Sequence, residues 1–273
     1  MGRMLNLTLV LLLSNLNVAA EPLENRADFA IPLDLSELVG DSYPRINEMT
    51  ADELNILSER ISSYSIPERV AIYAHLQAGT PYKGGALGEE QLPDTDPFIR
   101  YDVTDCTILN LISVSLAHSD STSSPRVHMA KAGYSPDTTP SYRSRLHFTT
   151  DRLDVSPYFE DVTEKFGKAL TKKVILNRKP DGSHWVPIDW ERPRKIRYIP
   201  ASEAGQIKDY PEILGVAFLK EKFLDKGLDV LHEGLLYRGK QVIHGSSKNG
   251  KVVVESYEDM LSRYDGVVLF SYK

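Results

Sequence analysis

The order of the predicted elements constrains the fold of this chain most. Helix-forming patterns fill the first part of the sequence, whereas the second half consists of short β-prone runs separated mainly by Gly, Pro, Asn or Asp. These runs span residues 173–177, 195–199, 213–219, 231–237, 241–244, 252–255 and 267–272. Helices followed by a series of strands are typical of an α+β fold with an antiparallel sheet. The basic run 192–197 is expected to be a solvated edge strand.

Two short helices are predicted ahead of this sheet from their N-terminal capping residues. Thr50 and Glu53 form a capping box for a helix that runs to about residue 62. Ser65 caps the second helix, which has Pro67 in its first turn and Glu68 at its third position. We expect these two helices to pack together as an N-terminal layer.

A third, more apolar helix is predicted in the middle of the chain. Residues 105–117 are almost uniformly apolar and too many for a strand, so they favour a buried helix capped by Thr104 or Asp105. Residues 119–141 are rich in Ser, Thr and Pro and are expected to form a surface excursion.

Residues 1–20 have the pattern of a secretory signal peptide. Arg3 is their only charge, residues 5–13 form a short apolar run, and Val18-Ala19-Ala20 supplies small residues for cleavage. The run is shorter than the roughly 20 residues that span a bilayer. We therefore expect a signal peptide over 1–20, a surface lead-in over 21–49 and a single domain over 50–273. The mature protein is expected to be exported and soluble, in the periplasm or the medium.

The charge balance argues against one class of partner. The chain has 38 Asp and Glu against 32 Lys and Arg, which gives a formal net charge of −6. This balance gives no reason to expect a nucleic-acid partner. No segment after the signal peptide is apolar enough for a membrane helix, so no stable membrane insertion is expected. The sequence leaves the oligomeric state open.

Cys106 is the only cysteine of the chain and lies at the predicted start of the buried helix. A lone thiol cannot form an internal disulfide, so Cys106 is either a buried structural residue or a nucleophile. The positive end of a helix favours a thiolate, so we expect the pKa of Cys106 to lie below the free value of about 8.5. Free backbone N–H groups of the same turn could also hold an oxyanion.

Two downstream histidines complete a candidate catalytic set. His232 and His244 lie on either side of an Arg-Gly-Lys sequence at 238–240, which predicts a β-hairpin with one histidine on each arm. His232 would take the thiol proton, and His244 would fix the orientation and tautomer of the His232 ring. Taken singly, each histidine is also compatible with a half-buried strand residue.

These motifs resemble those of the NlpC-type papain-like cell-wall cysteine peptidases. The resemblance rests on Gly-Thr-Pro-Tyr-Lys-Gly-Gly at 79–85, Asp-Cys at 105–106, His-Glu-Gly-Leu-Leu-Tyr at 232–237 and Ile-His-Gly-Ser-Ser at 243–247. The segment Tyr-Arg-Ser-Arg-Leu-His-Phe at 142–148 is similar to the N-acetylmuramoyl-L-alanine amidase-like branch of that superfamily. Asp-Val-Thr at 161–163, Tyr-Ile-Pro at 198–200 and Gly-Leu-Asp at 227–229 fit the same branch. The likeness covers roughly residues 65–273.

The resemblance implies a papain-like core and a peptidoglycan hydrolase. Its catalytic residues would be Cys106, His232 and His244, and its substrate would be peptidoglycan or muropeptides, with no cofactor and no metal. The preferred reaction is cleavage of the amide between N-acetylmuramic acid and L-alanine. The alternatives are a stem-peptide endopeptidase with the same triad, a non-catalytic cell-wall binder, and an acyltransferase or lipid hydrolase. The expected substrate-binding residues are Tyr82, Asp105, Arg145 and His147.

The chain also departs from the family pattern at three positions. The family often has Thr-Phe-Val-Glu where this chain has Ile-Leu-Asn-Leu at 108–111, so Leu111 replaces a carboxylate. The usual valine after the catalytic histidine is Glu233, and an aromatic residue of the family is replaced by Arg152. These changes leave the proposed triad intact.

Overall fold

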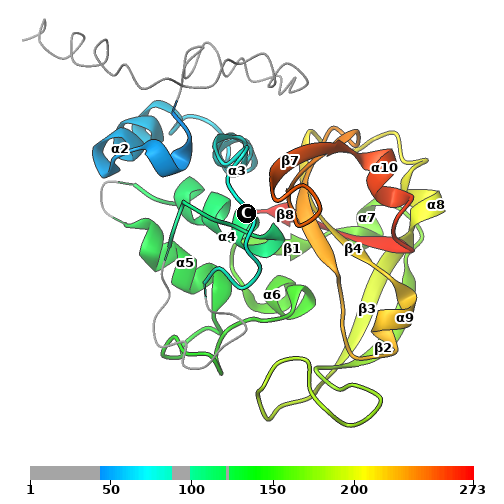
Figure 1. Cartoon of the computed structure of the whole chain (residues 1–273). Coiled ribbons are helices and arrows are strands. Elements are labelled where there is room, and N and C mark those ends of the chain that lie inside the picture. The colour runs from blue at the N-terminus through cyan, green and yellow to red at the C-terminus, as the bar shows by residue number, and fades with distance from the viewer. Residues whose placement is uncertain (1–43, 88–98, 121–122) are drawn as a thin grey trace, which may run out of the picture. The chain divides into compact units, whose positions relative to one another are not determined.

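The chain forms helices first and an antiparallel sheet afterwards, as its sequence predicts (Figure 1). The computed structural model describes residues 44–87, 99–120 and 123–273. The helices are η2 (Ile46–Glu48), α2 (Ala51–Arg60), α3 (Ile66–Leu76), α4 (Cys106–Ala117), α5 (Pro125–Gly133), α6 (Thr149–Val155), α7 (Thr163–Phe166), α8 (Ala201–Ala204), α9 (Glu221–Leu224) and α10 (Tyr257–Leu261). The strands are β1 (Phe159–Asp161), β2 (Leu170–Leu176), β3 (Arg192–Pro200), β4 (Ile213–Leu219), β5 (His232–Tyr237), β6 (Gln241–Ser246), β7 (Lys251–Ser256) and β8 (Gly266–Tyr272).

The predicted capping box at Thr50 and the predicted N-cap at Ser65 are confirmed. The Thr50 hydroxyl accepts from the Glu53 backbone N–H at 3.2 Å, and the Glu53 carboxylate accepts from the Thr50 N–H at 2.7 Å. Glu68 accepts in the same way from the Ser65 N–H at 2.7 Å, with Pro67 in the first turn of α3. Because each box satisfies backbone donors that a helix start leaves open, the capping residues fix where α2 and α3 begin.

Helix α4 is the buried helix predicted from its apolar composition. Its residues from Ile108 to Ala117 are all buried, and Asp105 is its N-cap. Helices α3 and α5 both pack against it. The prediction of a surface excursion over 119–141 is wrong, because Pro125 and Ser124 begin α5, which buries Met129 and Ala132.

The sheet has the strand order β2-β3-β8-β4-β5-β6-β7, with β1 also paired to β8, and every strand pairing is antiparallel. The central strand β4 is buried along its whole length. The predicted edge character of the basic run 192–197 is confirmed, because in the described residues this run pairs only with β2, and β3 pairs with β8 only at Ile199 and Pro200. Two arginines of this run form ion pairs with Asp151, which is only 1% exposed: Arg192 at 2.8 Å and Arg194 at 2.7 Å.

Strands β5 and β6 form the predicted hairpin and approach the start of α4. Arg238 and Gly239 take positive φ angles of 49° and 65° at the turn, and the Lys240 N–H donates to the Tyr237 carbonyl at 2.9 Å. Gly245 on β6 lies so close to the start of α4 that a Cβ atom there would be 2.7 Å from the Asp105 carbonyl carbon. Glycine is therefore required where this strand meets the helix.

Residues Arg45–Lys273 form one compact unit. The predicted signal peptide over 1–20 and most of the predicted lead-in over 21–49 lie outside the described residues. Within the described ranges, none of the helices combines the length and the apolar character needed to cross a membrane.

Candidate active site

Cys106 is the first residue of α4, where the local sequence holds it in a fixed position. The Asp105 carboxylate accepts from the Thr107 N–H at 2.9 Å and from the Ile108 N–H at 2.8 Å, which satisfies two donors of the first turn. Residues Ile108–Ala117 of the helix are buried, whereas Cys106 and Thr107 are half-buried. Cys106 therefore lies at the partly exposed end of an otherwise buried helix.

The hairpin brings the two predicted histidines together. Nε2 of His232 lies 2.8 Å from Nδ1 of His244, and the two ring planes are nearly perpendicular at 87°. His232 is half-buried and His244 is buried with 2% exposure. The predicted hydrogen bond across the hairpin is therefore present.

Cys106 lies beside this pair. The backbone N–H of Glu233, the residue after His232, donates to the sulfur of Cys106. Gly245, the residue after His244, lies against the Asp105–Cys106 peptide. The structure thus brings all three predicted catalytic residues to the place where α4, β5 and β6 meet.

The expected low pKa of the thiol is wrong. Burial raises the pKa of Cys106 to about 12, and the negative charges of Asp105 and Glu233 act in the same direction. Burial and the neighbouring His244 lower the pKa of His232 to about 3. At neutral pH the two groups are therefore a neutral thiol and a neutral imidazole. The expected oxyanion donors are also reduced, because Asp105 accepts from two N–H groups of the first turn.

We expect iodoacetamide to alkylate folded Cys106 at least about tenfold more slowly than free cysteine at pH 7. A raised pKa lowers the thiolate fraction at pH 7, so the rate should increase with pH up to at least pH 10. The same chain in denaturant is a matched control, because Cys106 is its only cysteine. Faster labelling of the folded protein below pH 7 would contradict the raised pKa.

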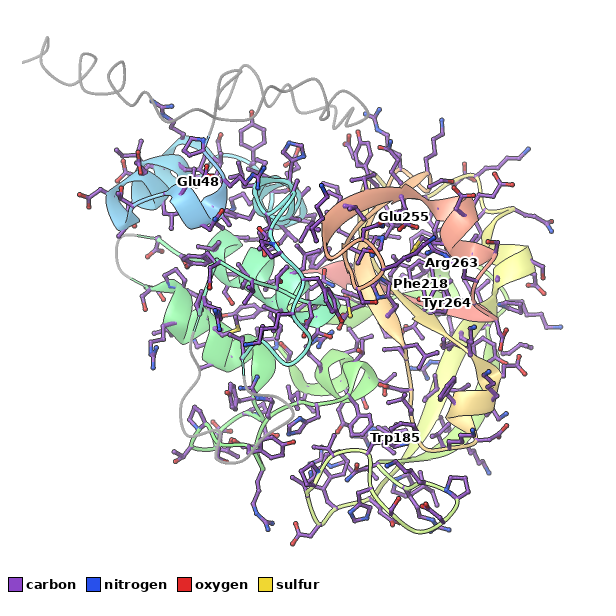
Figure 2. The ribbon with its side chains drawn as sticks, in the orientation of Figure 1. Glu48, Trp185, Phe218, Glu255, Arg263 and Tyr264 are labelled. Carbon is purple, nitrogen blue, oxygen red and sulfur yellow. The ribbon has the colours of Figure 1, made fainter. Side chains whose placement is uncertain are left out.

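Two aromatic residues that the sequence did not indicate border the histidine. The ring of Tyr264 stacks on His232 at 9° and 6.4 Å, and Phe218 lies 5.0 Å from Tyr264 (Figure 2). Burial raises the pKa of Tyr264, and the nearby Cys106 contributes in the same direction, which places this phenol near the sulfur. Tyr264 follows α10 in a turn, where no motif marks it, so only the tertiary structure identifies it.

Two of the three departures from the family pattern, at positions 152 and 233, meet close to the cysteine. Arg152 and Glu233 are each 1% exposed and form an ion pair of 2.5 Å. Glu233 also accepts from the Thr107 hydroxyl at 2.5 Å and from the Asn110 amide at 3.4 Å. The unusual arginine and the unusual carboxylate therefore compensate each other in a buried network that includes the first turns of α4.

The loop that carries Tyr82 runs alongside the approach to Cys106. The Tyr82 N–H donates to the Gly250 carbonyl, and the Lys83 N–H donates to the Thr104 carbonyl, both at 2.8 Å. Pro81 in turn accepts from the Thr104 N–H at 3.0 Å. Tyr82 and Asp105 are thus held next to the candidate site by backbone hydrogen bonds.

Arg145 and His147 form hydrogen bonds with residues outside the candidate catalytic set. Arg145 is 7% exposed and donates to the Tyr134 hydroxyl at 2.7 Å and to the Leu87 carbonyl at 3.4 Å. Nε2 of His147 lies 2.7 Å from the Tyr142 carbonyl oxygen. The described contacts do not join either residue to the catalytic three, and they favour a role in holding neighbouring segments.

A resident metal ion has no ready set of ligands in the part of the chain that the structure describes. There, no group of three or more His, Cys, Asp or Glu side chains lies close enough to hold one.

Comparison with known proteins identifies the family. No curated protein matches the chain. An N-acetylmuramoyl-L-alanine amidase from Bacteroides uniformis matches with a TM-score of 0.60 and 19% identity, over 76% of this chain and 99% of the other. A protein from Legionella pneumophila matches with a TM-score of 0.64 and 18% identity, over 81% and 93% of the two chains. Because residues 73–267 match the sequence profile described as N-acetylmuramoyl-L-alanine amidase-like, the chain belongs to that family.

Proposed function

We propose that this chain is a cysteine amidase that hydrolyses the amide between N-acetylmuramic acid and L-alanine in muropeptides. The observation that carries the proposal is the hydrogen-bonded pair His232–His244 beside the only cysteine of the chain. Membership of the amidase-like family supports a peptidoglycan substrate. An acyl-enzyme mechanism in a papain-like core accounts for why these three side chains meet at one helix start.

In this proposal Cys106 is the nucleophile, His232 the base and His244 the residue that orients the base. The His232 ring points Nε2 at His244, which leaves Nδ1 as the nitrogen that serves the thiol. Because burial lowers the pKa of His232, its imidazole is neutral at pH 7 and keeps one unprotonated nitrogen for the thiol proton.

The reaction then runs in two stages. His232 takes the proton of Cys106 as the sulfur attacks the lactyl carbonyl carbon, and the tetrahedral intermediate collapses with cleavage of the C–N bond. The same proton passes to the departing amine of L-alanine, which leaves a thioester on Cys106. Water then attacks the thioester and gives a proton to His232, which returns it to the departing sulfur, so that the muramic carboxylic acid and the free thiol are formed.

Tyr82 and Asp105 are proposed to border the substrate, since their segments flank the thiol. Substrate contacts for Arg145 and His147 stay predictions, and the buried position of Arg145 favours support of the Leu87 segment. We also propose that the protein is exported, on the basis of the pattern over 1–20.

A defined pair of substrates tests the bond that is cleaved. We expect the protein to release the intact peptide from an N-acetylmuramyl-tetrapeptide and to leave the sugar-free tetrapeptide uncut, as measured by mass spectrometry. The variant Cys106→Ala is the matched control for a contaminating amidase. Cleavage within the sugar-free peptide at a comparable rate would instead establish an endopeptidase, and binding without turnover would establish a non-catalytic binder.

A further inference from the structure

We propose that Glu255 is a positioning residue that fixes the tautomer of His244 and, through it, the tautomer of His232. The inference deepens the proposed function and rests on it, since it assigns Nδ1 of His232 as the atom that receives the thiol proton. Glu255 belongs to no motif of the sequence and is recognised only from its place beside the histidine pair.

The sheet register places Glu255 on the same face as His244. Val253 of β7 lies opposite His244 of β6, and Glu255 follows two residues later, so its side chain points to the same side of the sheet. Its Oε1 lies 3.5 Å from Nε2 of His244. This nitrogen is buried, and no described atom meets the full geometry of a hydrogen bond to it.

Glu255 is held as an acceptor by two donors. Arg263, in the turn after α10, donates to Oε2, and both side chains are labelled in Figure 2. The Asn249 amide donates to Oε1 at 3.1 Å. The Glu255 side chain is only 20% exposed, and its hydrogen bonds with Arg263 and Asn249 hold it in this partly desolvated position. An ionised carboxylate has only acceptor atoms, so whatever faces Oε1 from His244 is stabilised as a donor.

The tautomers of both histidines follow from this one contact. A carboxylate at Nε2 of His244 favours the N–H at that nitrogen, because a lone pair there would face negative charge. Nδ1 of His244 is then the acceptor, so Nε2 of His232 must be the donor across the 2.8 Å contact. A neutral His232 that carries its proton on Nε2 has an unprotonated Nδ1, which is the state that a base for Cys106 needs.

The isosteric change Glu255→Gln should reverse this order. Arg263 can only donate, whereas the Asn249 amide can turn its oxygen toward the new N–H group, so the amide oxygen should face Arg263 and the amide N–H should face His244. Nε2 of His244 would then accept, Nδ1 would carry the proton, and His232 would be left protonated on Nδ1. A base with the wrong tautomer is expected to lose on the order of 10²-fold or more in kcat, while KM changes little.

The kinetic test compares Glu255→Gln with Glu258→Gln on an N-acetylmuramyl-tetrapeptide. Glu258 is an exposed carboxylate on α10, and its replacement should leave kcat within about twofold of wild type, as surface changes usually do. Glu255→Asp keeps the acceptor chemistry and should recover part of the loss. Full activity of Glu255→Gln would overturn the proposal.

A spectroscopic measurement on the wild-type protein keeps the test independent of the substrate and of the variant's folding. Nitrogen-15 NMR of the imidazole rings should show His244 protonated on Nε2 and His232 protonated on Nε2, and Glu255→Gln should move both protons to Nδ1. Finding wild-type His244 protonated on Nδ1 would refute the role of Glu255. The predicted tautomers without any amidase turnover would uphold it and reject the proposed reaction instead.

Discussion

Replacement of Cys106 by alanine is expected to lower amidase turnover by at least about 10³-fold and to leave the fold intact. The sulfur forms the covalent intermediate in the proposed reaction, and no other residue at the site replaces it. The fold should survive because Cys106 is half-buried and the cap of α4 depends on Asp105. Release of tetrapeptide from an N-acetylmuramyl-tetrapeptide measures the loss, and thermal unfolding checks the fold.

Cys106→Ser is the companion variant, because it keeps the size of the side chain and changes only the nucleophile. We expect it to be about as inactive as alanine, since His232 with its low pKa is a poor base for a hydroxyl. Turnover of Cys106→Ala within about tenfold of wild type would remove the cysteine mechanism. The roles assigned to His232 and Glu255 would then have to be derived anew.

The neutral state of the site also decides how the covalent step begins. A thiol with a pKa of about 12 beside an imidazole with a pKa of about 3 does not form an ion pair at rest. Proton transfer must therefore accompany attack on the substrate, and the position of the accepting nitrogen matters more than the resting charge of the sulfur. The proposed mechanism therefore requires the His232 tautomer that has an unprotonated Nδ1.

Local sequence patterns were enough to predict the helix starts and the hairpin that position this site. The box at Thr50, the cap at Asp105 and the hairpin tip at Arg238–Gly239 depend on residues close together in the chain, and their physical chemistry can be read directly. Because the hairpin length fixes which strand residues face each other, the sequence also allowed the contact between the two histidines to be predicted.

Long-range contacts supplied what the sequence did not indicate. The pKa of Cys106 is raised mainly by burial, and the charge of Glu233, which is 127 positions away in the numbering, adds to it only in the folded sheet. Tyr264 and Glu255 are ordinary surface-type residues until α10 and β7 fold beside the hairpin. Helix α5 was missed because its Ser- and Pro-rich start, which is typical of loops, is also a favourable helix N-terminus.

The buried pair Arg152–Glu233 leads to the second large effect. We expect Arg152→Met and Glu233→Gln each to lower the free energy of unfolding by about 3–5 kcal/mol, because either change leaves one buried charge without its partner. The double variant should cost less than the sum of the two, since it removes both charges and keeps an acceptor for Thr107. Urea denaturation of the four proteins gives the coupling energy.

The exposed pair Arg143–Asp189 provides a control with the same 2.5 Å separation. Its side chains are 69% and 72% exposed, so Arg143→Met should change the free energy of unfolding by no more than about 1 kcal/mol. The N–O distance is thus the same in the two ion pairs, which differ in burial and in the hydrogen bonds that Glu233 accepts from Thr107 and Asn110. If Arg152→Met cost as little as Arg143→Met, the arginine would not be compensating Glu233. The departures at 152 and 233 would then be independent changes, and the carboxylate close to Cys106 would need another source of stabilisation.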